Sequence, residues 1–186
     1  MQAALLLGFL TIERAAELAW ARRNTRRLLR RGAEEAAPRQ YPWIVAFHGA
    51  WLAGLWLAAW GREPDPAWLW AFGLAQALRL WVLLSLGGRW TTRIIVLPRA
   101  PLIRTGPYRW MAHPNYVAVA AEIAIVPLAF GLWGYAAAAS FLNALLLALR
   151  IRAETAALAR ARPLTPAGGS PGGRRGCAGA RRGRGR

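Results

Sequence analysis

The stretch from Pro101 to Glu122 collects polar and aromatic side chains in a chain that is otherwise rich in Leu, Ala and Trp. Gly106-Pro107 predicts a turn. His113-Pro114 predicts a helix start, because proline fits the first helical turn. Asn115 and Glu122 would then share one helical face at i, i+7 spacing. A carboxylate in an apolar helix is costly unless it has a partner or a task. This stretch is therefore the first candidate for a site that does chemistry.

A second set of candidate groups follows the last apolar run of the chain. Arg150 and Glu154 come just after Leu149, and they form an i, i+4 pair on what reads as one continuing helix. Metal chemistry is not expected. Cys177 is the single cysteine, and the two histidines, His48 and His113, lie far apart, which argues against a zinc site. His48 is interpreted mainly as a core histidine.

Long apolar runs must position these groups, and about 20 such residues span a bilayer core. The first helix, 2–21, is read as a retained membrane helix, because no basic region precedes it and no cleavage site follows it. The other runs are 41–60, 67–86, 114–133 with a kink predicted at Pro127, and 134–149 continuing through Glu154. Runs 41–60 and 67–86 predict an antiparallel hairpin, and Ile94 to Leu97 predicts a short strand or a buried extended piece. The expected fold class is all-α: a multi-pass integral membrane bundle of about five transmembrane helices.

Arginine supplies the basic charge of the chain, which has 25 basic residues, 8 acidic residues, a net charge of +17 and no Lys. The connection after the first helix holds seven arginines, the turn at 61–66 holds one, the connection 87–113 holds five, the turn near Gly134 holds none, and the segment from Arg150 onward holds ten. Under the positive-inside rule, this alternation predicts an outside N-terminus and a cytoplasmic C-terminus. The expected location is the bacterial inner membrane, with the site on the cytoplasmic side.

Two basic segments have more than one interpretation. The six arginines between Arg22 and Arg31 have helical spacing, so they can extend the first helix along lipid headgroups or form a solvated charged face. The composition divides the chain into a membrane domain, 1–162, and a disordered Arg/Gly-rich tail, 163–186. Such a tail can bind RNA or acidic lipid. The favoured interpretation is an accidental tail, such as a shifted reading frame, and no nucleic-acid partner is expected.

Several motifs together resemble the isoprenylcysteine carboxyl methyltransferase family, in its bacterial branch. The matching segments are Gly87 to Ile94, Gly106-Pro107-Tyr108-Arg109, His113-Pro114-Asn115-Tyr116, Glu122, and Asn143 through Arg150 to Glu154. The resemblance covers about residues 12–158. It implies an integral membrane enzyme that uses S-adenosylmethionine. The implied cofactor-binding residues are His113, Tyr116, Arg150 and Glu154. His113 and Arg150 are also the predicted catalytic residues.

The groups present suit such a cofactor, whose sulfonium and amino groups need an acidic partner and whose carboxylate needs a basic or ring N–H donor. Methyl transfer to a phenol or enol also needs a base, for which His113 is the nearest candidate. Arg104, Arg109 and Glu122 are the predicted substrate-binding residues. The expected acceptor is a carboxyl or hydroxyl oxygen of a lipid-like molecule, either an alkylpyrone or phenolic lipid or an isoprenylcysteine-like compound. Membrane lipids are the other expected partners.

Two alternatives stay open. Sterol reductases look like distant structural kin of the family, so a membrane reductase using NADPH is one alternative. A non-catalytic homologue is the other, and it rests on departures from the family pattern. Ala112 precedes His-Pro where Arg is usual, Ala118 stands where Gly is often found, and Thr155 follows Glu154 where a second Glu is common.

Overall fold

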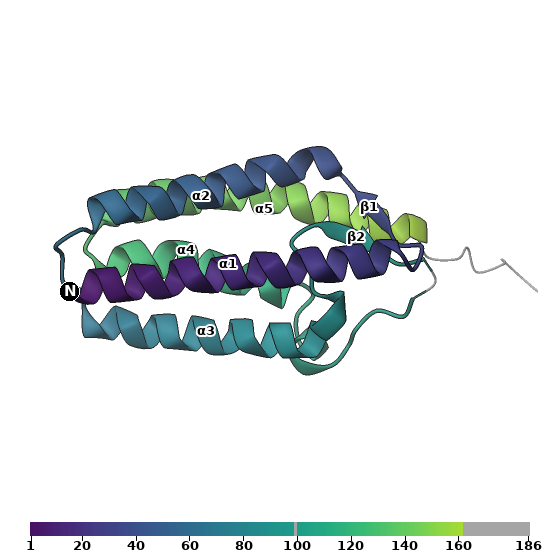
Figure 1. Ribbon diagram of the computed structural model, residues 1–186, viewed down its shortest axis with the longest axis horizontal. Coiled ribbons are helices and arrows are strands. Elements are labelled where there is room, and N and C mark those ends of the chain that lie inside the picture. Colours follow the sequence, from purple (N-terminus) through teal and green to yellow (C-terminus); the bar gives the residue numbers. More distant parts are fainter. Residues whose placement is uncertain (99, 162–186) are drawn as a thin grey trace, which may run out of the picture.

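The computed structural model describes residues 1–98 and 100–161, so the tail predicted to be disordered lies outside the described residues. Its long helices, five in the described residues, run along the long axis of the molecule (Figure 1). The helices are α1 (Gln2–Leu29), α2 (Tyr41–Ala58), α3 (Pro66–Leu86), α4 (Pro114–Ala129) and α5 (Trp133–Ala161). Their number agrees with the five apolar runs of the sequence.

The prediction that α2 and α3 pack together as an antiparallel hairpin is wrong. The chain reverses direction at the turn, but α2 and α3 lie on opposite sides of the bundle (Figure 1). The tightest packing is of α3 against α4 and of α4 against α5, while α2 packs against α1 and α5. The turn explains this, because the Asp65 amide donates to the Ala129 carbonyl at 2.8 Å and Arg62 Nη1 donates to the Phe130 carbonyl at 3.3 Å. These bonds hold the start of α3 at the end of α4.

Helix α1 extends into the arginine-rich segment, as one of the two interpretations of that segment predicted, whereas the end of α4 differs from the prediction. α1 continues to Leu29 through the arginine-rich segment, because its polar residues there still present a buried face of Asn24, Thr25 and Leu28. α4 ends at Ala129 rather than near Trp133. Pro127 lies close to this end, so the proline precedes the stop of the helix instead of lying in its middle.

A small two-stranded antiparallel sheet accompanies the helices, which make up most of the described residues, as the all-α expectation predicted. β1 (Glu34–Ala36) pairs with β2 (Ile94–Val96), and Glu35 lies opposite Ile95. The extended piece predicted at Ile94 is confirmed as a strand. β1 was not predicted, because two of its three residues are glutamates, which are uncommon in strands. Arg93 Nη1 donates to Glu35 Oε1 at 2.8 Å and ties the two segments together.

Among the described residues, two helices are long and apolar enough to cross a membrane, Pro66–Arg89 and Trp133–Ala161. α4 is apolar but has only 16 residues. Large apolar side chains on these and neighbouring helices point outward, including Leu57, Trp70 and Leu84. An apolar exterior of this kind suits contact with lipid. A span count of about five stays a prediction.

A buried ionic cluster lies inside the bundle, where α1, α3 and α4 meet. Arg79 is 3% exposed, and its guanidinium forms a two-pronged contact with the Glu122 carboxylate, with Nε donating to Oε1 at 2.5 Å. Its Nη1 also lies 3.4 Å from Glu17 Oε1. Arg14 lies 2.8 Å from Glu17 Oε2. The sequence predicted that the Glu122 carboxylate needs a partner or a task, and the structure shows Arg79 as its partner.

Candidate functional site

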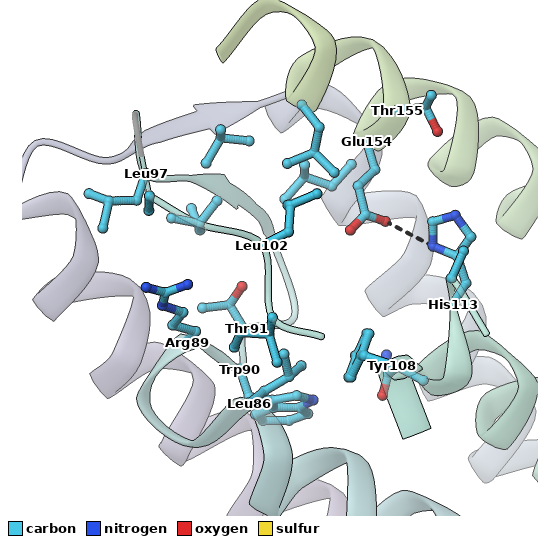
Figure 2. Close-up of a pocket in the computed structure, with 18 of the residues that line it drawn as sticks. Leu86, Arg89, Trp90, Thr91, Leu97, Leu102, Tyr108, His113, Glu154 and Thr155 are labelled. Carbon is cyan, nitrogen blue, oxygen red and sulfur yellow. Dashed lines mark ion pairs between the residues drawn. The ribbon is translucent and has the colours of Figure 1, made fainter. Parts of the chain in front are cut away.

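A cavity of about 530 Å³ opens at the end of the bundle that carries the small sheet. Its walls come from β2, the connection before α4, the start of α4 and the last turns of α5. Figure 2 shows His113 and Glu154 pointing toward each other on one side, with Thr91, Leu97 and Leu102 on the opposite side. The cavity thus has one side rich in ionisable groups and another with more apolar side chains.

Tyr116 connects the two helices that form the polar side. Its hydroxyl donates to Glu154 Oε2 at 2.5 Å and accepts from Arg150 Nε at 3.0 Å. Arg150 is buried, and its Nη2 donates to the Thr92 carbonyl at 2.8 Å. Tyr116 lies in the first turn of α4, and Arg150 and Glu154 lie one turn apart on α5. The helix spacing predicted from sequence therefore places both α5 groups against one tyrosine.

His113 is the residue that precedes α4, as its His-Pro motif predicted. Its ring stacks on Tyr116 with centroids 5.3 Å apart, and its Nδ1 lies 3.7 Å from Glu154 Oε2. The side chains of His113 and Glu154 are each 30% exposed. A ligand can therefore reach both groups, while the ring of His113 is held by stacking.

The other predicted site residues do not all lie at this cavity. Arg104 lines the cavity and is exposed. Arg109 is exposed and is not among the residues that line this cavity, and Glu122 lies in the ionic cluster of the bundle. His48 bonds through Nδ1 to the Ile44 carbonyl at 2.8 Å on its own helix. The structure thus brings together His113, Tyr116, Arg150 and Glu154, with Arg104 at the same cavity.

Three further residues line the cavity and were not chosen from the sequence. Tyr108 stands beside the polar side, and burial, followed by the nearby Glu154 charge, raises the pKa of its phenol. Trp90 is 3% exposed, and within the described residues its Nε1 has no hydrogen-bond partner. Asn115 Oδ1 is also buried and unpartnered there. All three residues lie within the motifs that carried the resemblance, so the sequence already contained a signal for them.

Unpartnered buried polar atoms are uncommon in proteins and call for an explanation. The Trp90 indole N–H and the Asn115 amide oxygen are two such atoms among the described residues, and Glu154, Arg150 and His113 line the same cavity as Trp90 and Asn115. This donor and acceptor set fits a small ligand that carries both a cationic and an anionic group, as S-adenosylmethionine does. No group of three or more His, Cys, Asp or Glu residues in the described part of the chain is placed to hold a metal ion.

Comparison with known proteins defines the class of this protein. The model of the isoprenylcysteine carboxyl methyltransferase (ICMT) family matches residues 68–160, which include the cavity-forming helices α4 and α5. The chain is also 39% identical over 162 residues to "Uncharacterized protein YpbQ" of Bacillus subtilis (strain 168), covering 83% of this chain and 95% of that protein. No solved structure matches.

The chain therefore belongs to the isoprenylcysteine carboxyl methyltransferase family, as its motifs predicted. At the level of the family, this membership supports a membrane methyltransferase. The family match also covers Pro114 to Tyr116 and Arg150 to Glu154, the segments that build the polar side of the cavity.

Proposed function

We propose that the protein transfers a methyl group from S-adenosylmethionine to a carboxyl or hydroxyl oxygen of a lipid-like acceptor. The observation that carries the proposal is the Tyr116–Glu154–Arg150 group with His113 beside it, at the side of a 530 Å³ cavity. When bound, the cofactor supplies an electrophilic methyl group on a positively charged sulfur. Glu154 offers the negative charge for its cationic part, and Arg150 and His113 offer donors for its carboxylate.

The protein residues have limited proton chemistry to perform. A carboxylate acceptor carries no proton, so Arg150 or Arg104 needs only to hold and orient its oxygens. A phenol or enol acceptor must lose a proton, and His113 is partly exposed beside the polar side and is placed to take it. Tyr108 keeps its proton at neutral pH, because burial raises its pKa, so its hydroxyl can hydrogen-bond to a ligand but does not act as the base.

The acceptor proposal rests on the second side of the cavity. Leu86, Leu97 and Leu102 line it, and Leu102 is 46% exposed, so apolar surface continues from the cavity outward (Figure 2). A long apolar chain gains about 0.8 kcal/mol for each CH₂ that it buries. An alkylpyrone, a phenolic lipid or an isoprenylcysteine-like compound fits this division, with its oxygen at the polar side and its chain along the leucines.

The test supplies purified protein with methyl-labelled S-adenosylmethionine and a matched series of alkylpyrones, alkylresorcinols and prenylcysteines. We expect binding of the cofactor and transfer of label that is at least about tenfold more efficient with long chains than with short ones. Equal methylation of the water-soluble head groups would contradict the lipid acceptor. Failure to bind the cofactor would contradict methyl transfer and favour a non-catalytic homologue, or a reductase if NADPH bound instead.

We further propose that the protein is a multi-pass protein of the bacterial inner membrane with its site on the cytoplasmic side. The arginine-rich connections on either side of the cavity support this orientation. Reporter fusions after Glu63 should give the periplasmic signal, and fusions after Arg104 should give the cytoplasmic signal. The reverse pattern of signals would contradict the orientation.

A further inference from the structure

Six arginines at the end of α1 and just after it are the largest group of uncompensated charges in the described residues. Arg22, Arg23, Arg26, Arg27, Arg30 and Arg31 are all exposed, and within residues 1–98 and 100–161 none of them forms an ion pair. Arg93, by contrast, pairs with Glu35. Charges of one sign held close together attract an anion more strongly than scattered charges do.

Four of these side chains surround a common space. Arg22, Arg23, Arg26 and Arg30, together with Ala19, line a hollow of about 350 Å³. Their spacing explains why these side chains lie together. Arg22, Arg26 and Arg30 are at i, i+4 and i+8 and so form one stripe along the helix, and Arg23 flanks that stripe. Guanidinium groups present paired N–H donors that match phosphate oxygens. The chemistry of this hollow therefore suits a phosphate group.

The exposed side chains of α1 indicate where the hollow lies relative to a bilayer. Along the helix, the exposed Leu5, Phe9 and Ile12 come first, Trp20 follows at 37% exposure, and the arginines come next. From Leu5 to Trp20 the helix rises about 22 Å, which fits within a hydrocarbon core of about 30 Å. Apolar, aromatic and basic residues occur in this order where a helix leaves a bilayer.

A second aromatic group lies at the same end of the bundle. Trp81 is in the last turns of α3, Trp110 follows the turn at Gly106, and their rings are 5.3 Å apart. Both are exposed, at 42% and 67%. The end of the bundle with the cavity therefore carries exposed tryptophans on two elements, with the arginine-lined hollow just beyond Trp20.

We infer that this hollow binds the phosphate headgroup of an anionic phospholipid, and that the bound lipid braces the end of α1 that forms the cavity. Leu28 lines the cavity from the opposite face of the same turns. Asn24 Nδ2 donates to the carbonyls of Trp90 and Gly87 at 2.9 and 3.2 Å. The inference does not depend on methyl transfer, because it rests on the charges of α1 and on the exposed tryptophans at the same end of the bundle.

The experiment compares two double variants of the full chain that lose the same charge. Arg26→Gln with Arg30→Gln removes two arginines of the hollow, and glutamine keeps good helix propensity. Arg39→Gln with Arg160→Gln removes two exposed arginines elsewhere. Binding of short-chain phosphatidylglycerol is measured by native mass spectrometry and by the shift in melting temperature in a neutral detergent. Short-chain phosphatidylcholine, inorganic phosphate and an RNA oligonucleotide serve as comparison ligands.

We expect the protein to retain phosphatidylglycerol in preference to phosphatidylcholine and to melt at a higher temperature with it. The hollow variant should bind phosphatidylglycerol about 25-fold more weakly, since each arginine near a lipid surface contributes about fivefold, and the control should bind as the unaltered chain does. Equal losses in both variants would show a diffuse charge effect and overturn the site. Equal binding of the two lipids, inorganic phosphate binding as tightly as phosphatidylglycerol, or tighter binding of RNA would overturn it too.

Discussion

Glu154→Gln is expected to weaken S-adenosylmethionine binding by about 10- to 100-fold. Its carboxylate accepts the Tyr116 hydroxyl at 2.5 Å and lies 3.7 Å from His113 Nδ1, so it supplies the negative charge of the polar side. Glutamine preserves the size and one acceptor but removes that charge. Hydrogen bonds to charged groups contribute about 1.5–3 kcal/mol, which corresponds to the expected loss. The dissociation constant of labelled cofactor measures it directly.

A matched control separates the site from general charge effects. Glu34→Gln removes the same charge from an exposed position on β1, at the same end of the molecule, and should leave cofactor binding unchanged.

The two histidines give a second comparison. His113→Ala should reduce binding or turnover, whereas His48→Ala, whose ring bonds to its own helix, should have far less effect. Similar losses at His48 and His113 would contradict this placement of the site.

Arg79→Ala is expected to lower the free energy of unfolding by about 3–5 kcal/mol, because removing one partner of a buried ion pair leaves the other charge uncompensated. Arg79 and Glu122 are 3% and 4% exposed, and Glu17 and Arg14 belong to the same cluster. For a chain of this size, the loss corresponds to a fall in melting temperature of about 10 °C. Thermal unfolding in detergent, followed by intrinsic tryptophan fluorescence, measures it.

A double variant tests whether the uncompensated Glu122 charge causes the loss of stability in Arg79→Ala. Arg79→Met combined with Glu122→Leu removes both members of the pair, so it should recover part of the stability lost in Arg79→Ala. Arg39→Ala, at an exposed arginine, should change the unfolding free energy by no more than about 0.5 kcal/mol. An Arg79→Ala protein that melts at the unaltered temperature would show that the cluster does not stabilise the bundle.

Local sequence patterns determined the helices and which ionisable residues form the polar side of the cavity. Apolar runs placed five helices, because side-chain periodicity and proline act over a few residues. His113-Pro114 marked the start of α4, and the i, i+4 spacing of Arg150 and Glu154 put both groups on one helical face. These relations depend on neighbours within one or two turns. They therefore survive whatever the helices pack against.

Tertiary structure alone decided which segments meet. The sequence indicated that Glu122 needs a partner, but Arg79 and Glu17 come from other helices. The same holds for α3, which packs against α4 instead of α2, and for β1, whose glutamates form a strand only because Ile94 to Val96 lies beside them. Contacts between distant segments depend on how whole helix faces fit and on bonds such as the one from Asp65 to Ala129. No local sequence pattern encodes contacts of this kind. The sequence therefore could not show that Trp90 Nε1 and Asn115 Oδ1 are buried without a partner, and only the tertiary structure showed it.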